Sequence, residues 1–260
     1  MKMHLIAFAL VAGIASISLV PDANAAEEGA ALPSVDWSFS GPFGTFDRAQ
    51  LQRGYKVYKE VCANCHSMRL LAFRNLGQRG GPEFSEPAVE VLAAEATVTD
   101  GPNDDGDMFE RPGKPADRFP SPFANEQAAR ASNGGAYPPD LSVIAKARAG
   151  GPNYLHALLT GYEEPPAGFE LREGMQYNAF FPGHQIGMPP PLSEGAVEYT
   201  DETPATVDQY AKDVAAFLMW AAEPSLEARH ETGFKVIIFL LVLSGLMYLT
   251  KKKVWAREAH

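Results

Sequence analysis

The sequence predicts a mainly α-helical domain with long loop insertions, followed by one C-terminal transmembrane helix. Two segments, 47–65 and 206–222, carry apolar residues at every third or fourth position, which is the spacing of an amphipathic helix. A largely apolar run fills residues 233–250. The chain of 260 residues also has 23 glycines and 21 prolines, which indicates long loops between the helices.

The first 25 residues have the pattern of a secretory signal peptide. Lys2 precedes an apolar run over residues 5–20, and residues 23–25 (Ala-Asn-Ala) form a small-residue cleavage site. We therefore expect cleavage after residue 25 and a mature chain outside the cytoplasm. The alternative is an uncleaved membrane anchor, against which Pro21 and Asp22 argue.

The segment 47–65 is the first predicted helix of the mature chain. Asp47 is a suitable N-cap, because its carboxylate can accept a hydrogen bond from the first helical turn. Gly54 in the helix interior costs about 1 kcal/mol relative to Ala. We interpret it as a place where another helix comes close.

The segment 206–222 is the candidate partner helix. Thr206 and Gln209 have the spacing of a T-x-x-Q capping box, and Pro224 ends the pattern. One apolar stripe follows the segment, formed by Val207, Tyr210, Val214, Phe217 and Leu218.

The apolar run 233–250 is close to the roughly 20 residues that a bilayer core requires. Lys235 can snorkel to the headgroups. Residues 251–253 are lysines, and Trp255 and Arg257 follow, so the positive-inside rule places the C-terminus in the cytoplasm. We expect four parts: a signal peptide (1–25), a periplasmic domain (26–230), a transmembrane anchor helix (231–250) and a basic cytoplasmic tail (251–260).

The whole chain has a net charge of −10, and because the tail is basic, the rest of the chain is more acidic still, with acidic residues concentrated in 99–110 and 194–203. Such clusters are either a solvated surface or an electrostatic docking field for a basic soluble partner. A nucleic-acid partner is not expected for so acidic a domain.

The chain's two cysteines, Cys62 and Cys65, lie in "VCANCHSM", and His66 follows directly. A thioredoxin-like dithiol would need a βαβ setting, which the pattern nearby does not show. A zinc site would need scattered histidines such as His156, His184 and His230. The spacing C-x-x-C-H instead favours covalent attachment of a c-type haem, with His66 as the proximal iron ligand.

A second axial ligand is then needed, and a methionine would raise the reduction potential and suit electron transfer. Met188 precedes three prolines that fix the backbone, so its loop can hold a thioether rigidly. Met175 is the second candidate. His184 is a rival ligand that would give a lower potential.

Several long stretches together resemble the cytochrome c1 family, the haem c subunit of the cytochrome bc1 complex. They are "FSGPFGTFDRAQLQRGYKVYKEVCANCHSM", "DRFPSPFANEQAARASNGGAYPPDLSVIAKAR", "LLTGYEEPPAG", "YNAFFPGHQIGMPPPL" and "ATVDQYAKDVAAFLMWAAEP". The resemblance runs from about residue 36 to the C-terminus and favours an alphaproteobacterial type. It implies a domain like that of class I cytochromes c, in which Gly54 and Tyr58 cross Val214 and Phe217.

The resemblance also implies roles for individual residues. Cys62 and Cys65 match the thioether cysteines, and His66 and Met188 match the axial iron ligands. The haem pocket and propionate contacts match Arg148, Tyr154, Asn133, Pro138 and Pro139. Some bacterial relatives brace the methionine loop with an extra disulfide. Here no cysteine is spare, so Pro189, Pro190 and Pro191 and side-chain packing must brace it.

The implied role is electron transfer rather than bond chemistry by this chain itself. The family takes an electron from the Rieske iron–sulfur protein and passes it to a soluble, basic c-type cytochrome. It sits beside cytochrome b in a dimeric complex of the bacterial inner membrane, with the haem domain in the periplasm. The alternatives are a membrane-anchored haem c subunit of a terminal oxidase, a ligand-binding haem c enzyme and a thiol oxidoreductase.

Overall fold

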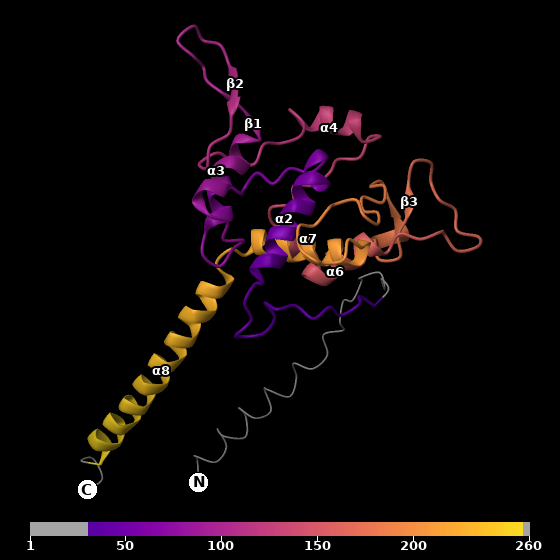
Figure 1. Cartoon of the computed structure of the whole chain (residues 1–260). Helices are drawn as coiled ribbons and strands as arrows, with labels where there is room; N and C mark the ends of the chain where they lie inside the picture. Colours follow the sequence, from indigo (N-terminus) through magenta and orange to yellow (C-terminus); the bar gives the residue numbers. More distant parts are fainter. Residues whose placement is uncertain (1–30, 257–260) are drawn as a thin grey trace, which may run out of the picture.

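A computed structural model of the protein describes residues 31–256 (Figure 1). The predicted signal peptide, residues 1–25, and the last four residues, including Arg257, lie outside the described residues. We call residues 31–225 the head, because they precede the long C-terminal helix. Element labels follow Figure 1.

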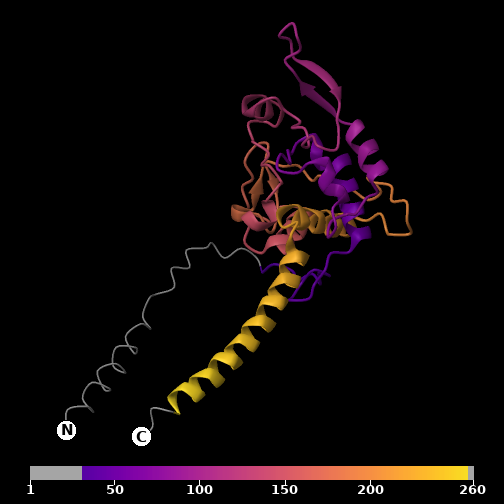
Figure 2. The ribbon, with the colours of Figure 1, turned by 90° about the vertical axis from the view of Figure 1, so that its left-hand side faces the viewer.

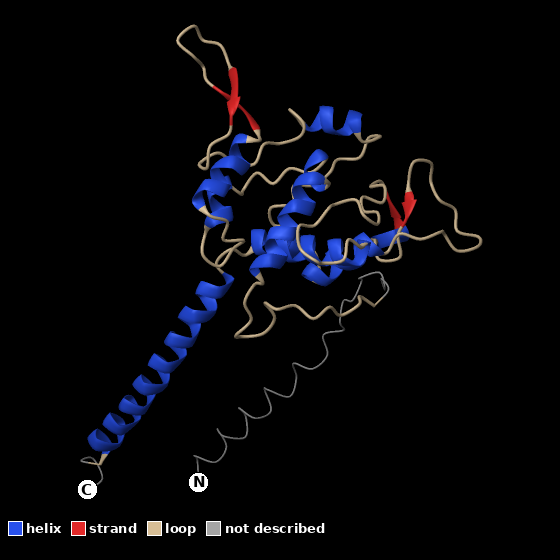
Figure 3. Ribbon diagram, viewed as in Figure 1, coloured by secondary structure: helices blue, strands red, loops and turns tan. Residues whose placement is uncertain are grey.

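Helices dominate the described part of the chain, and Figure 3 shows them joined by long loops. The α-helices are α2 (Arg48–Glu60), α3 (Glu86–Ala94), α4 (Glu126–Ser132), α5 (Ile144–Ala147), α6 (Gly151–Thr160), α7 (Val207–Ala222) and α8 (Leu226–Trp255). The 3₁₀ turns are η1 (Cys62–Asn64), η2 (Phe73–Gly77) and η3 (Pro182–His184). The strands are β1 (Thr97–Asp100), β2 (Phe109–Pro112), β3 (Gln176–Tyr177) and β4 (Gln185–Ile186). The mainly helical fold class is confirmed.

The crossing of α2 and α7 lies in the middle of the head (Figure 1). A Cβ on Gly54 would lie 2.1 Å from the carbonyl oxygen of Asp213 and 2.7 Å from Cβ of Phe217. Only glycine lets two backbones come this close. The rings of Tyr58 and Phe217 pack with their centroids 5.9 Å apart. The predicted close approach of the two helices is confirmed.

The hydrophobic core forms around this crossing. Leu51 and Val57 from α2, and Val214 and Phe217 from α7, are completely buried, and Trp220 is nearly so. Burying a side chain such as Phe217 contributes roughly 2–3 kcal/mol relative to leaving it exposed. Helices α5 and α6 also pack against α7, so α7 supports most of the head.

Helix α2 begins as predicted and ends earlier than predicted. The Asp47 carboxylate accepts a hydrogen bond from the Gln50 amide at 3.1 Å. The helix stops at Glu60 instead of continuing to residue 65. The Asn64 side chain donates to the Glu60 carbonyl at 3.1 Å and to the Val61 carbonyl at 3.2 Å, and these carbonyls have lost their helical partners. The chain then tightens into the 3₁₀ turn η1.

Helix α7 begins with half of the predicted capping box. The Thr206 hydroxyl accepts from the Gln209 amide at 3.3 Å, but the Gln209 side chain does not return to Thr206. It donates to the Asp213 carboxylate at 2.8 Å instead. Asp213 is completely buried, and a buried carboxylate without donors would be costly.

Two small antiparallel hairpins extend from the head. In the first, Thr97 pairs with Pro112, and the hairpin projects away from the helices in both Figure 1 and Figure 2. In the second, Gln176 pairs with Ile186. Residues 76–130 contain α3, the first hairpin and the beginning of α4.

Helix α8 leaves the head as one continuous rod (Figure 2). Within residues 31–256 it is the one helix long and apolar enough to cross a membrane, with a mean hydropathy of 2.0 in its most apolar window. Its apolar side chains from Phe234 to Trp255 are exposed, whereas Leu226 is buried against the head. This arrangement fits a transmembrane anchor.

Candidate functional site

Cys62 begins the 3₁₀ turn η1, one residue after α2, and Cys65 is the residue that caps its end. The Cys65 amide donates to the Cys62 carbonyl at 3.1 Å, and the His66 amide donates to the same carbonyl at 2.8 Å. In a 3₁₀ turn, residues i and i+3 are eclipsed, so Cys62 and Cys65 share one face. The predicted helix 47–65 would have carried both cysteines in its last turn; the structure has a 3₁₀ turn there instead. Both thiols are unpaired, and Cys65 is exposed.

His66 is fixed by one ring nitrogen. Its Nδ1 lies 2.8 Å from the Pro139 carbonyl oxygen, an acceptor, so Nδ1 carries the proton and Nε2 keeps a free lone pair. Burial lowers the pKa of His66, although the bond to the Pro139 carbonyl acts in the opposite direction. A neutral imidazole with one nitrogen oriented by a carbonyl is the usual state of a metal-binding histidine.

Asp140 holds the His66 loop against the segment that follows Pro139. Its carboxylate accepts from the Ser67 hydroxyl at 2.8 Å, from the Arg69 amide at 3.0 Å and from the Ser142 amide at 2.9 Å. Burial opposes ionisation, but these hydrogen bonds outweigh it and lower the pKa of Asp140 to about 2. The carboxylate is therefore charged at neutral pH, which strengthens each hydrogen bond that it accepts.

The Met188 loop follows the second hairpin and is also held by a side chain. The Tyr162 hydroxyl donates to the Met188 carbonyl oxygen at 3.1 Å. Burial raises the pKa of Tyr162, so this hydroxyl remains a donor at all ordinary pH values. A Cβ on Gly187 would lie 3.3 Å from Cβ of Ala136, which brings the loop against the segment that precedes Pro139.

Residues 136–139 therefore connect the two candidate axial ligands. Ala136 touches the turn that carries Met188, and Pro139 binds the ring of His66. The two ligands are far apart in the sequence, and this four-residue segment brings their loops together. The donor set, with two thiols on one face, an oriented imidazole and a thioether loop, fits a covalently attached haem.

Met175 also lies close to this loop. Its Sδ is 3.8 Å from the position of a Cβ on Gly187, and the residue directly precedes β3. Met175 and Met188 are both half-buried. The choice between the two methionines therefore stays a prediction, favouring Met188.

The other predicted pocket residues lie on the elements around these loops. Arg148, exposed, follows α5, and Tyr154, buried, lies on α6. Burial raises the pKa of Tyr154, and the positive charge of Arg148 opposes this rise, so the two groups are near each other. The Asn133 side chain donates to the Ala129 carbonyl at 2.7 Å and ends α4.

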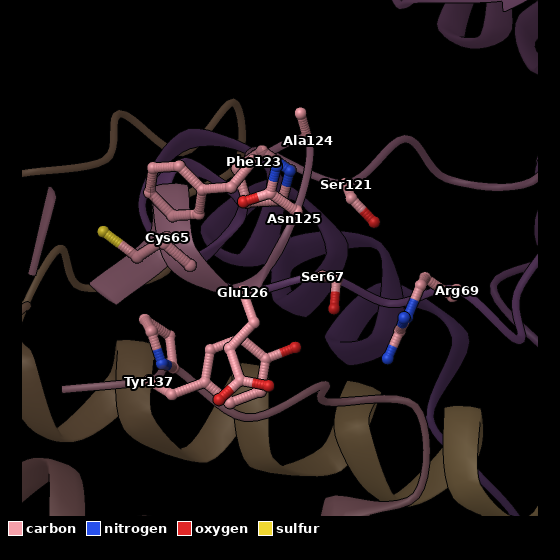
Figure 4. Close-up of a pocket in the computed structure, with 12 residues that line it drawn as sticks. Cys65, Ser67, Arg69, Ser121, Phe123, Ala124, Asn125, Glu126 and Tyr137 are labelled. Carbon is pink, nitrogen blue, oxygen red and sulfur yellow. The ribbon is translucent and has the colours of Figure 1, made fainter. Parts of the chain in front are cut away.

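A hollow of about 140 Å³ opens beside Cys65 (Figure 4). Pro138, Tyr137, Phe123 and Glu126 line it together with Cys65. Neither His66 nor Met188 lines this hollow, and neither does Arg148 or Tyr154. It is a surface depression next to one cysteine and not the space between the candidate axial ligands.

The histidines named as possible zinc ligands lie in separate contacts. Nε2 of His156 is 2.9 Å from an Asp208 carboxylate oxygen, Nδ1 of His184 is 3.3 Å from the Asn178 carbonyl, and Nδ1 of His230 is 3.3 Å from the Gly44 carbonyl. Over residues 31–256 no three His, Cys, Asp or Glu side chains gather in a metal-binding cluster.

Sequence reasoning did not identify Asp140 or Tyr162. Asp140 directly follows the predicted pocket residues Pro138 and Pro139. Its position beside them was the one feature of the sequence that could have indicated its role. Tyr162 lies in the quoted stretch "LLTGYEEPPAG", but its bond to the Met188 loop depends on long-range packing.

Comparisons with known proteins place the chain among its relatives. A sequence model of the Cytochrome C1 family matches residues 37–258. The chain is 48% identical over 268 residues to cytochrome c1 of Rhodospirillum rubrum, covering 97% of each chain. It is 53% identical over 236 residues to "Cytochrome c1 1, heme protein, mitochondrial" of Arabidopsis thaliana, covering 91% of this chain and 76% of the relative. It is 55% identical over 275 residues to cytochrome b/c1 of Bradyrhizobium diazoefficiens, covering 98% of this chain but 40% of that longer protein.

Proposed function

The chain belongs to the cytochrome c1 family, and from this premise we propose that it is the haem c electron-transfer subunit of a cytochrome bc1 complex. The observation that carries the proposal is the orientation of His66, which follows the C-x-x-C pair and offers Nε2 because Nδ1 is bound to Pro139. The names of the relatives, cytochrome c1 and cytochrome b/c1, agree with this role.

We assign the residues that hold the haem as follows. Cys62 and Cys65 would hold it covalently through thioether bonds, and His66 Nε2 and Met188 Sδ would ligate its iron. When bound, the haem supplies reversible one-electron transfer, and methionine ligation favours a high potential. Tyr162 keeps the Met188 loop in place, because its hydroxyl donates to the backbone of that loop.

The remaining predicted pocket residues would position the edge of the haem. Arg148 and Tyr154 contact the propionates, for which a guanidinium fork is a suitable partner. Asn133, Pro138 and Pro139 form the wall that packs against it. The proximity of Arg148 to Tyr154 and the bond between Pro139 and His66 support these assignments.

We further propose how the subunit is placed. Residues 26–230 form a periplasmic domain, residues 231–250 cross the inner membrane, and residues 251–260 form a cytoplasmic tail. The lysines at the end of α8 support this orientation. The subunit takes one electron from the Rieske iron–sulfur protein and delivers it to a soluble, basic c-type cytochrome, beside cytochrome b in a dimeric complex.

The decisive experiment is a spectrum of the reduced, purified full chain with and without carbon monoxide. We expect a covalent haem c that does not bind carbon monoxide, because Met188 closes the sixth position. Met188→Leu should keep the covalent haem, lower the potential and admit carbon monoxide. The matched control Met175→Leu should behave like wild type.

Each other outcome of these experiments favours a different function or a different iron ligand. Carbon monoxide binding by the wild-type protein would favour a ligand-binding haem enzyme, and free thiols without haem would favour a thiol oxidoreductase. If Met175→Leu opens the site and Met188→Leu does not, the assigned axial ligand is wrong while the role of the subunit stands.

Docking of the basic acceptor can be tested at two exposed acids, Glu163 and Glu164. Reversing both charges to Lys should slow electron transfer to the acceptor at low salt, and the difference should vanish at high salt. Asp201 is a poor choice for the same test, because its carboxylate pairs with Arg53 at 3.0 Å, so reversing its charge would also place a cation beside Arg53. An unchanged rate at low salt would exclude Glu163 and Glu164 from the docking surface.

A further inference from the structure

Phe43 is the most exposed large apolar side chain of the head, at 78%. It lies at the tip of a tight loop, in which the Gly44 amide donates to the Gly41 carbonyl at 3.4 Å and the Thr45 amide donates to the Ser38 carbonyl at 3.1 Å. A Cβ on Gly44 would lie 2.3 Å from the backbone of Phe39, so the loop is closed tightly and needs glycine there. Because Phe43 contacts the exposed Phe234, its ring extends the contiguous exposed apolar surface of α8, and such a surface indicates an interaction site.

The loop lies against the first turns of α8. Figure 1 and Figure 2 both show the indigo segment that precedes α2 beside the start of α8. The His230 Nδ1 lies 3.3 Å from the Gly44 carbonyl, and the rings of Phe43 and Phe234 meet edge to face at 6.1 Å. The tip of the loop is therefore beside the second and third turns of α8.

A charged pair locks this arrangement. The Arg48 guanidinium binds both carboxylate oxygens of Glu227, each at 2.7 Å, and the Phe46 amide donates to one of them at 2.8 Å. Glu227, His230 and Phe234 lie at positions i, i+3 and i+7, so they form one face of α8. Residues 43–48 cover this face and cannot move independently of the helix.

The depth of Phe43 follows from helix geometry. Phe234 precedes the first lysine of the tail, Lys251, by 17 positions, which is about 25 Å along the axis at 1.5 Å per residue. A bilayer hydrocarbon core is about 30 Å thick. With the lysines at one headgroup layer, Phe234 lies just inside the opposite boundary of the core, and the ring of Phe43 is level with it.

The charges nearby agree with this depth. Glu231 precedes Lys251 by 20 positions, about 30 Å along the axis, which is the level where headgroups begin. Lys235 lies deeper and reaches back to the Glu231 carboxylate at 2.7 Å. Aromatic side chains are enriched at this boundary. Since α8 is already the membrane anchor, the surface that continues it beside Phe43 faces lipid.

We propose that the loop Gly41–Gly44 is a second membrane contact, in which Phe43 inserts its ring between lipid headgroups and acyl chains beside Phe234. The anchor helix and the loop then touch the bilayer at two neighbouring points. Because Arg48 and Glu227 join them, the two contacts fix the tilt of the head on the membrane. A helix without the loop would tether the head but leave it free to tilt.

Photo-crosslinking of the full chain in phospholipid nanodiscs tests this directly. p-Benzoylphenylalanine replaces Phe43 in one variant, Met247 within the apolar part of α8 in a second, and Met108 on the distant hairpin in a third. Mass spectrometry of the irradiated peptides should find phospholipid adducts at positions 43 and 247 and none at position 108. The same adduct at position 43 is expected in the assembled complex.

Two results would overturn the proposal. One is the absence of a lipid adduct at position 43 while position 247 gives one. The other is an adduct to a protein chain at position 43 in the assembled complex, since the surface would then face a subunit. As an independent check, Phe43→Trp should add emission that bromine-labelled phospholipids quench more strongly than aqueous iodide; the reverse order argues against insertion.

Discussion

The crossing of α2 and α7 makes a sharp prediction for Gly54→Ala. The new Cβ would lie 2.1 Å from the Asp213 carbonyl oxygen, whereas ordinary van der Waals contact begins near 3.4 Å. The obstacle is backbone, so no side-chain rotation relieves it and the helices must separate by about 1 Å.

The free-energy change can be worked out from two opposing effects. Overpacking a well-packed core costs about 1–3 kcal/mol, and a backbone obstacle belongs at the upper end. Alanine recovers about 1 kcal/mol of helix propensity relative to glycine. The net loss of unfolding free energy is about 2 kcal/mol, which corresponds to a fall in Tm of about 4–8 °C for a domain of this size.

The assay is thermal unfolding of the full chain in detergent, followed by far-UV circular dichroism. Gly233→Ala is the matched control, because a Cβ there meets nothing within 4 Å, and it should leave the Tm unchanged or slightly higher. If Gly54→Ala also leaves the Tm unchanged or raises it, the helices do not cross as closely as described, and the reasoning fails.

Three further predictions concern two ion pairs and the methionine loop. Arg53→Met should lower the unfolding free energy by about 3–5 kcal/mol, since it leaves the completely buried Asp213 without its cation; adding Asp213→Leu should recover part of this loss. Tyr162→Phe should cost about 1 kcal/mol and increase the fraction of reduced protein that binds carbon monoxide, because the Met188 backbone loses its donor. The hydrogen bonds from the Arg111 guanidinium lower the pKa of Asp117 to about 2. The contribution of the Asp117 carboxylate to the unfolding free energy is therefore complete above pH 4 and is lost as the pH falls toward 2. Acid unfolding curves measure this loss.

Each of these has a result that would contradict it. The buried ion pair is unimportant if Arg53→Met melts like wild type. The hydroxyl does not hold the loop if Tyr162→Phe binds no more carbon monoxide than wild type does. Asp117→Asn should lower the unfolding free energy at pH 7 and flatten its dependence on pH between pH 4 and pH 2. If the pH dependence of this variant equals that of wild type, Asp117 does not cause the loss of stability in acid.

Local patterns predicted the parts of the fold that depend on neighbouring residues. Asp47 caps α2 and Thr206 caps α7 because a cap needs a partner only two or three positions away. The apolar run of α8 needed no tertiary information at all. Gly54 was predictable because a glycine inside a strong helical pattern needs a reason, and a second helix supplies it.

Tertiary contacts decided what the sequence did not reveal. Gln209 could have returned to Thr206, but the buried carboxylate of Asp213 was the stronger acceptor. Asp140 clamps the His66 loop across more than seventy positions, and no local pattern indicates such a bond. The sequence pattern extended the first helix through both cysteines, whereas the tighter turn that carries them depends on where α2 ends.

The α2–α7 crossing also determines how long α2 waits for its partner helix during synthesis of the chain. Arg53 and Asp213 are 160 positions apart, so a ribosome adding about 5–20 residues per second needs about 10–30 s to complete the partner of α2. Until then α2 has no α7 to pack against, and the two thiols that follow it belong to an unfinished chain. Cys62 therefore stays accessible for many seconds before the head closes over it, whereas Cys65 remains exposed in the folded head.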